Sequence, residues 1–263
     1  MGSESTAPDY GGVAERWLSL LVVVGLAGAW ELAVRVGWLR SLFFPAPSRW
    51  IETLFRMAAG GGLWPALGAT LYRLLAGVLL GGGGGMVLGW LMGALRPVRV
   101  VLDPLVAALH PLPKLALFPL FLVTLGIGES SMIALVTLAA VFPMLLSVMA
   151  GVLQIDGLYL DVALTHGASR MLILRRVILP GSLPMVLTGL RLALNGALVV
   201  VIAVEMLSAQ RGLGAMVWLA WQTMRIQALY AVLLVIAALG LGFNWLLRRL
   251  AVRLTPWQAN GGT

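Results

Sequence analysis

The chain has 263 residues, of which 60% are hydrophobic and only 11% are charged, and its mean hydropathy is +0.99. A soluble domain carries about 25% charged residues, so this composition excludes a soluble protein and indicates one embedded in a lipid bilayer. The absence of cysteine and the presence of only two histidines exclude disulfides, thiolate or histidine metal sites and cysteine nucleophiles, and the net charge of +8 is attributed to basic loop ends rather than to nucleic-acid binding.

The apolar segments predict six membrane spans. Residues 1–16 are polar and lack the basic start and short apolar core of a signal peptide, so we interpret them as a disordered tail. One transmembrane domain is expected over residues 17–255, followed by a short tail over 256–263. The predicted fold class is therefore an all-α membrane protein. Its spans are expected near 17–38, 66–95, 102–125, 131–153, 184–209 and 226–250.

An amphipathic helix is expected between the first two spans. Ser48 is placed to cap it, and Arg49, Glu52 and Arg56 would share its polar side. We expect this helix to lie in the membrane interface. The alternative is an ordinary extension of the second span.

The second span contains five consecutive glycines at residues 81–85. Small residues let helices approach closely in lipid, so we expect close packing there, with a hinge or an unwound segment as the alternative. Arg73, near the outer end of this span, is interpreted as an anchor to lipid headgroups rather than as a contact for a partner protein.

The third span contains charged residues and several prolines. In one continuous helix Asp103, His110 and Lys114 would lie on a narrow stripe, which we expect to face a translocation path. Lys114 would help an anion through, or would instead pair with a carboxylate such as Glu205. Kinks with freed carbonyl groups are predicted at Pro104, Pro111, Pro113 and Pro119.

The connection over residues 154–183 is too long for a tight turn and too apolar for a disordered loop. Its apolar residues recur at helical spacing on both sides of Gly167, which predicts two short helices with a glycine bend, the second ending at Pro180. Arg170 and its neighbouring arginines would face water or an anionic surface. Such an element needs a surface to dock on, either the membrane or a groove on a partner protein.

Three polar residues of the fifth span, Arg191, Asn195 and Glu205, share one helical face. A structural role against neighbouring spans is favoured over contact with a solute, although all three remain candidates for the translocation path together with His110 and Lys114. The distribution of Lys and Arg near the span ends favours a cytoplasmic location for both termini and for residues 154–183.

In the 161–180 segment, Asp161, Val162 and Ala163 are followed after three residues by Gly167, after nine more by Val177, and then by Leu179 and Pro180. This segment resembles the loop that membrane subunits of bacterial ABC importers offer to their ATPase subunits. That family's pattern is E-A-A, three residues, G, nine residues, I, one residue, L-P. Asp for Glu, Val for the second Ala and Val for Ile are modest departures. The matching positions, to which we add Arg170 as a candidate coupling residue, are Asp161, Val162, Ala163, Gly167, Val177, Leu179 and Pro180.

Other segments, such as "LHPLPKLALFPLFLVTLGIGE" and "QRGLGAMV", resemble the nitrate, sulfonate, taurine and bicarbonate branch of these permeases. The resemblance implies a type I importer fold in the bacterial inner membrane, a homodimer, two cytoplasmic ATPases and an extracytoplasmic solute-binding protein. It implies no cofactor on this chain, with ATP and Mg on the partner ATPase. The sequence accordingly has no ATP-binding loop of the form G-x-x-x-x-G-K-[ST].

Two other classes of function were weighed against this resemblance. A self-contained, ion-coupled secondary transporter would show inverted repeats and midplane ion ligands, and we find no repeat and few intramembrane acids. An intramembrane enzyme would show clustered catalytic residues or a metal motif, and none is present. The identity of the solute stays open, with a weak preference for small anions.

Overall fold

The computed structural model describes residues 13–256, and every regular element among them is a helix. The expectations for residues 1–12 and 257–263 lie outside the described residues. Helix α1 begins at Val13, slightly before the expected start of the first span. The elements are α1 (Val13–Arg35), α2 (Pro47–Ala59), α3 (Leu63–Ala94), α4 (Arg96–Leu109), η1 (Lys114–Leu117), α5 (Phe118–Leu125), α6 (Glu129–Leu153), α7 (Gly157–Thr165), α8 (Arg170–Ile173), η2 (Leu174–Ile178), α9 (Leu179–Ser208), α10 (Leu213–Gln222) and α11 (Ile226–Leu254).

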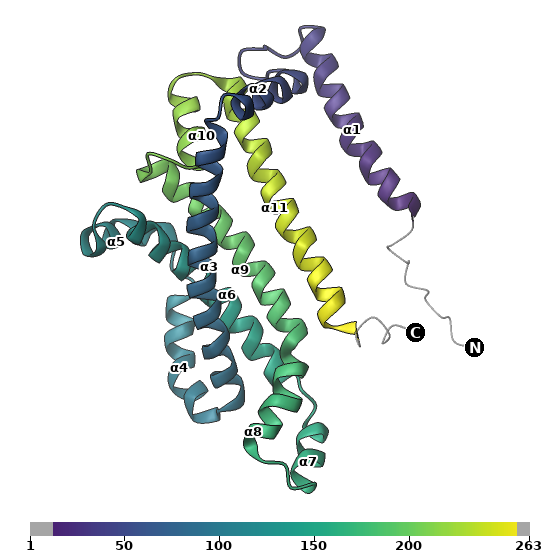
Figure 1. Ribbon diagram of the computed structural model, residues 1–263, viewed down its shortest axis with the longest axis vertical. Helices are drawn as coiled ribbons and strands as arrows, with labels where there is room; N and C mark the ends of the chain where they lie inside the picture. The colour runs from purple at the N-terminus through teal and green to yellow at the C-terminus, as the bar shows by residue number, and fades with distance from the viewer. Residues whose placement is uncertain (1–12, 257–263) are drawn as a thin grey trace.

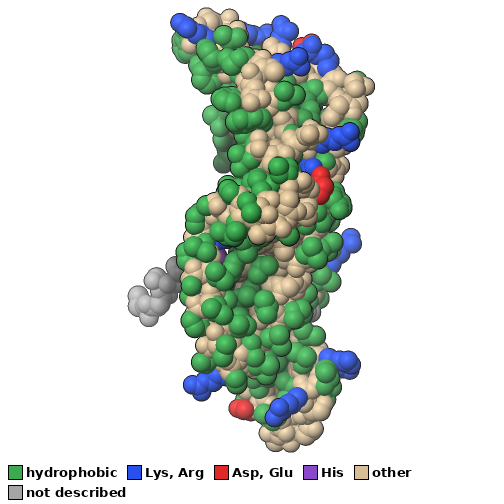
Figure 2. All heavy atoms as spheres, turned by 90° about the vertical axis from the view of Figure 1, so that its left-hand side faces the viewer, with side chains coloured by type: hydrophobic (Ala, Val, Ile, Leu, Met, Phe, Trp, Pro, Cys, Tyr) green, Lys and Arg blue, Asp and Glu red, His purple; other side chains and the backbone are tan. Residues whose placement is uncertain are grey.

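Helices α3, α6 and α9 form the centre of the bundle, and α11 packs along α9 and α10 (Figure 1). Helix α1 stands apart from this centre and contacts α2. Figure 1 also shows α2 and α10 near one end of the molecule, called here the α2/α10 end, and α7 and α8 at the opposite end. On the face shown in Figure 2, hydrophobic side chains are spread over the surface between the two ends, as expected for a protein that faces lipid.

Among the described residues, four helices are long and apolar enough to cross a membrane: α3, α6, α11 and a continuous 39-residue helix, Arg170–Ser208. The pair formed by α4 and the segment Lys114–Leu125 makes a fifth if it is counted as one span, but it is bent by 88°. The first expected span is the 23-residue helix α1. The six expected segments are therefore all helical, and the third is not a straight span.

The glycines of α3 allow it to approach α6 closely. A Cβ atom added at Gly81 would lie only 2.2 Å from the carbonyl oxygen of Thr137, and one at Gly89 would lie 2.6 Å from that of Leu145. Every fourth residue of α3 over this contact is a glycine, so one helical face is free of side chains. The other glycines of this face are Gly77, Gly85 and Gly93. Close packing is thus confirmed, and the alternative of an unwound segment is wrong because α3 is continuous.

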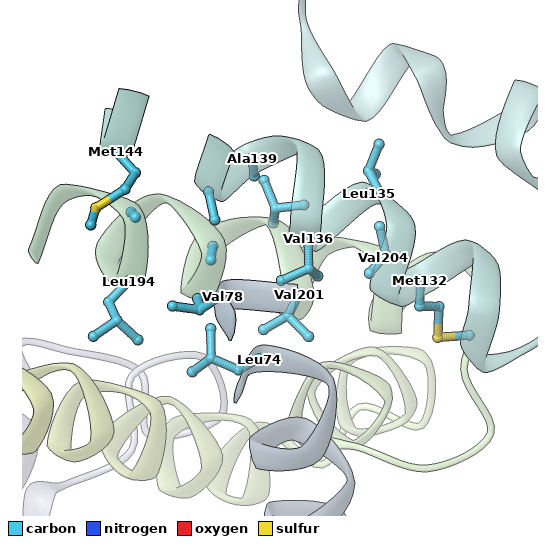
Figure 3. Packing of buried hydrophobic residues seen from close by; sticks show 14 of the residues in the cluster. Leu74, Val78, Met132, Leu135, Val136, Ala139, Met144, Leu194, Val201 and Val204 are labelled. Atoms are coloured by element: carbon cyan, nitrogen blue, oxygen red, sulfur yellow. The ribbon is translucent and has the colours of Figure 1, made fainter. Parts of the chain in front are cut away.

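Apolar side chains from α3, α6 and α9 fill the space beside this contact. In Figure 3, Leu74 and Val78 of α3 lie close to Leu194 and Val201 of α9, with Val136 of α6 beside them. All five side chains are buried. The core of the bundle is therefore shared by three helices that are distant in sequence.

Helix α2 is a separate element, so the alternative of an extension of the second span is wrong. The expected cap is also wrong, because the N-cap residue is Ala46 and makes no side-chain hydrogen bond. The Ser48 hydroxyl instead donates to the Glu31 carboxylate of α1 at 2.9 Å, and its N–H donates to the same carboxylate at 3.1 Å. Ser48 therefore binds the Glu31 carboxylate instead of capping α2, and this contact connects α1 to α2.

The two faces of α2 differ as expected from its sequence. On the polar side, Glu52 lies 3.6 Å from Arg49 and 4.0 Å from Arg56. On the other side, the Trp50 ring stacks on Tyr230 of α11, with the ring centroids 4.8 Å apart. These contacts fix α2 across the α2/α10 end of the bundle.

The third expected span is broken between Leu109 and Lys114. Pro111 and Pro113 lie in the break, where a proline lacks an N–H donor and disfavours helical geometry at the residue before it. The kinks predicted at Pro111 and Pro113 are confirmed, whereas Pro104 lies inside the continuous helix α4 and Pro119 lies in the first turn of α5. The predicted single stripe is wrong, because Asp103 lies within α4 and Lys114 lies beyond the break.

Candidate functional site

Two short helices meet at the end of the molecule opposite α2 and α10 (Figure 1). They are α7 and α8, and residues 157–173 are called here the elbow. The Asp156 carboxylate caps α7 by accepting a hydrogen bond from the N–H of Leu158 at 2.9 Å. The Ser169 hydroxyl caps α8 by accepting from the N–H of Leu172 at 3.3 Å. The predicted short helix before Gly167 is thus confirmed, and a second helix begins after the bend, as expected.

Gly167 makes the bend between these helices. Its φ of +73° is left-handed, a conformation that glycine adopts without a steric penalty. The N–H of Gly167 donates to the carbonyl oxygen of Leu164 at 2.9 Å, and that of Ala168 donates to the carbonyl oxygen of Ala163 at 3.0 Å. These two bonds form a Schellman motif, which ends α7. The spacing of Ala163 and Gly167 in the sequence therefore has a geometric reason.

The helix that begins at Arg170 does not end at Pro180, so that expectation is wrong. It continues through a π-helical turn, η2, and enters α9. The N–H of Leu179 bonds to the carbonyl oxygen of Leu174, five residues back, and this wider turn precedes the proline. Pro180 follows this turn inside the continuous helix Arg170–Ser208, so the chain stays helical across the proline. The elbow is thus directly continuous with a bundle helix.

The elbow exposes apolar side chains at the end of the molecule opposite α2 and α10. Leu158, Tyr159 and Leu164 are 64%, 66% and 59% exposed, and Asp161 and Arg170 are exposed beside them. The candidate coupling residues fall into two groups. Those in the elbow are Asp161, Val162, Ala163, Gly167 and Arg170, and those near the junction with α9 are Val177, Leu179 and Pro180. The second group is half-buried against the bundle.

Arg73 is buried at the α2/α10 end of the bundle, so its interpretation as a headgroup anchor is wrong. The residue is only 3% exposed. One terminal nitrogen donates to the Glu205 carboxylate at 2.7 Å and to the carbonyl oxygen of Arg211 at 2.6 Å. The other side of the guanidinium forms a two-bond contact with the Glu129 carboxylate, with Nε at 2.7 Å. One arginine therefore joins α3, α6, α9 and the loop before α10.

Glu205 is fully buried in the same network. Its carboxylate accepts from the N–H of Gly214 at 2.9 Å and lies within 3.0 Å of the Thr70 hydroxyl. A Cβ atom at Gly212, where φ is +136°, would lie 2.4 Å from the carboxyl carbon. The carboxylate thus holds helices together, as favoured from the sequence. The alternative pairing of Glu205 with Lys114 is wrong.

Sequence reasoning missed this network, although Thr70 and Arg73 share a helical face. The sequence did contain a signal for it. Arg73 follows Thr70 by one helical turn, and two acids, Glu129 and Glu205, lie near the ends of later spans. The helix α10, between the fifth and sixth spans, was also missed, because its ten residues are too few to cross a membrane.

The remaining polar residues of the fifth span have separate environments. Asn195 pairs with Asn244 of α11, with amide contacts of 3.1 and 3.5 Å. The Nε atom of Arg191 is buried and has no hydrogen-bond partner. Arg191, Asn195 and Glu205 therefore do not form one group, because Glu205 has its own partners nearer the α2/α10 end.

His110 and Lys114 lie together at the break between α4 and η1. The Lys114 ammonium donates to the carbonyl oxygen of His110, which supplies the partner expected for a freed carbonyl group. The same nitrogen lies 5.6 Å from the ring centroid of Phe142. The Nδ1 atom of His110 is buried without a partner. Over residues 13–256, no group of three potential metal ligands is found.

Residues 85–256 match the family model described as "Binding-protein-dependent transport system inner membrane component". The chain belongs to this family. Its members are permeases of ABC transporters rather than enzymes, and they are inner-membrane proteins.

Two curated members of this permease family are similar over most of their length. The taurine transport system permease protein TauC of Escherichia coli is 36% identical over 92% of this chain and 90% of its own. The putative aliphatic sulfonates transport permease protein SsuC of Escherichia coli is 33% identical over 82% of each chain. These similarities agree with the branch suggested by the sequence.

The fold of the permease family is also found among solved structures. An inward facing structure of the MetNI methionine ABC transporter has a TM-score of 0.61 and 21% identity, covering 74% of this chain and 94% of that chain. At this identity the likeness concerns the fold alone. The expected all-α, type I importer permease fold is confirmed.

Proposed function

We propose that this chain is the membrane-spanning permease subunit of an ATP-driven importer for a small anionic solute of the sulfonate class. Membership of the binding-protein-dependent family supports delivery of the solute by an extracytoplasmic binding protein. The names of two similar permeases, for taurine and for aliphatic sulfonates, support the solute class. The sequence lacks an ATP-binding loop, so ATP and Mg bind a separate ATPase subunit.

The observation that supports coupling most strongly is the elbow. Its apolar side chains are uncovered, and an apolar helical face of this kind is suited to a groove on a partner protein. Because α8 runs through η2 into α9, movement of the elbow is transmitted to the centre of the bundle by a continuous helix. Movement of a docked ATPase can therefore move the bundle through this helix.

The proposed assembly contains two copies of this permease, two cytoplasmic ATPases and one binding protein. In this arrangement the elbow and both termini are cytoplasmic, and the α2/α10 end faces the binding protein. The candidate coupling residues of the elbow contact the ATPase, and those near the junction with α9 support the elbow. The translocation path runs through the bundle between the two ends.

Coupling is tested by placing a charge on the elbow. Val162→Glu puts a carboxylate on a half-exposed apolar position, and co-purification of the ATPase with the permease is measured. The expected result is loss of the ATPase with normal membrane insertion. Gln154→Glu, which adds the same charge just before α7, is the control and retains the ATPase. Retention of the ATPase by Val162→Glu contradicts docking on this surface.

A further inference from the structure

The break between α4 and η1 restricts what can surround it in a membrane. A helix broken at membrane depth frees backbone groups that lipid cannot satisfy, so such breaks occur where they are buried in protein or line a water-filled cavity. Here the chain turns by 88°, and in Figure 1 α5 projects sideways from the bundle. The break therefore faces protein or water in the working transporter.

Two cationic side chains inside the spans lack a carboxylate partner. None of the salt bridges among residues 13–256 includes Lys114 or Arg191. The Lys114 ammonium has the carbonyl oxygen of His110 as its partner, and the Nε atom of Arg191 has none. Unpaired cations inside a membrane are costly, and they mark ion or substrate pathways by default. Arg73, by contrast, is neutralised by two carboxylates.

Arg191 lies on α9, which runs antiparallel to α6. A Cβ atom at Gly151 of α6 would touch Met185 of α9, and one at Gly189 of α9 would touch Ser147 of α6. Residue numbers thus fall along α6 as they rise along α9. The two contacts fix the register of the helices.

This register places both cations within about one helical turn of each other along the bundle. Arg191 of α9 lies level with Leu145 of α6, three residues from Phe142, which is about 4.5 Å along the helix axis. Phe142 is the ring that the Lys114 ammonium approaches at 5.6 Å. In addition, η1 contacts both α6 and α9. Two helices and a broken span therefore bring positive charge to nearly the same depth.

We propose that Lys114 and Arg191 form a two-cation site for the oxyanion group of the transported solute. The site rests on the proposed function and names the part of the permease that contacts the solute. As the solute passes, the Lys114 ammonium exchanges the His110 carbonyl oxygen for a sulfonate oxygen, and Arg191 neutralises the same group. His110 adds a third polar atom through its unpartnered Nδ1. No covalent step is involved.

The test uses the assembled complex of permease, ATPase and binding protein in proteoliposomes, with taurine and ethanesulfonate as probes. Lys114→Met and Arg191→Met each remove one charge and keep an apolar stem. Each is expected to raise the half-saturating concentration or lower the rate of uptake at least about tenfold, as for loss of a charged hydrogen bond. Arg96→Met, at the exposed start of α4, is the control and imports as the wild type does.

A second measurement separates solute binding from packing. Because neither cation is neutralised in the folded chain, both Met variants are expected to assemble and to melt at the same temperature as the wild type or higher. Lys114→Arg, which keeps the charge, retains more uptake than Lys114→Met. Wild-type uptake by the Met variants, or their failure to assemble, overturns the two-cation site alone. A wild-type complex that imports neither probe overturns the proposed function and the site together.

Discussion

The Arg73 guanidinium lies 2.7 Å from the Glu205 carboxylate, although the two residues are 132 positions apart in the chain. Their contact joins α3 to α9 in a buried environment where neither charge meets water. Glu129 completes the pairing of Arg73 from the start of α6. The α2/α10 end of the bundle is thus held by one cation shared between two acids.

Removal of Arg73 is expected to weaken the bundle strongly. Arg73→Met leaves the Glu205 carboxylate buried and uncompensated, which costs about 3–5 kcal/mol. Adding Glu205→Gln removes the stranded charge and recovers part of this loss. Glu129→Gln, at a half-exposed carboxylate, costs about 1 kcal/mol or less. Thermal unfolding of the purified permease measures all three, and equal stability of Arg73→Met and the wild type contradicts the structural role.

Two neighbouring glycines of α3 are expected to respond oppositely to alanine. A Cβ atom at Gly81 would lie 2.2 Å from a backbone oxygen of α6, so Gly81→Ala forces the helices apart at a cost of about 1–3 kcal/mol. A Cβ atom at Gly84 meets nothing within 4 Å, so Gly84→Ala leaves stability unchanged or slightly raised. Melting temperatures of the two variants check this, and a similar loss in both refutes the one-sided packing of α3.

The glycine bend of the elbow is expected to be specific to its backbone geometry. Gly167→Ala places a side chain at a φ of +73°, which costs about 1–2 kcal/mol and weakens ATPase association by about tenfold. Gly167→Asn loses less, because asparagine tolerates this conformation. The control is Gly157→Ala, at the open first turn of α7. Titration of the ATPase against the permease in detergent gives the affinities, and no difference among them argues against a role for the bend.

The orientation of the elbow is open to direct labelling. The chain has no cysteine, so Thr165→Cys introduces a single exposed thiol at the end of α7. A membrane-impermeant maleimide is expected to label it in inside-out vesicles and to leave it unlabelled in intact spheroplasts. A cysteine at exposed Trp38, in the loop between α1 and α2, serves as the opposite control. Labelling of Thr165→Cys from outside reverses the proposed topology.

Features of the fold that depend on local chemistry could be predicted from the sequence. The glycine bend at Gly167 and the kinks near Pro111 follow from backbone geometry that few residues share. The close approach of α3 was also predictable, because small residues have few other uses inside a span. The expectation that the helix ends at Pro180 was wrong, because the π turn before the proline lets the helix continue across it.

Features that depend on distant residues could not be predicted. The environment of Arg73 is set by residues from α6 and α9, and no local pattern reveals that two acids enclose it. The predicted position of Lys114 assumed a continuous third helix. Because that helix is broken, Lys114 does not share a stripe with Asp103. His110 stayed beside Lys114, because a single turn of chain connects them. The residues of the candidate site could thus be named from the sequence, but their geometry depends on the packing of the bundle.

The central claim is that this permease does no work of its own and is driven through its elbow by a separate ATPase. The most direct measurement is ATP-dependent uptake of a sulfonate into proteoliposomes, with and without the ATPase and the binding protein. The account predicts accumulation against a gradient only when all three components and ATP are present, and none with the Val162→Glu permease. Uphill accumulation by this chain alone, driven by an ion gradient, would contradict it.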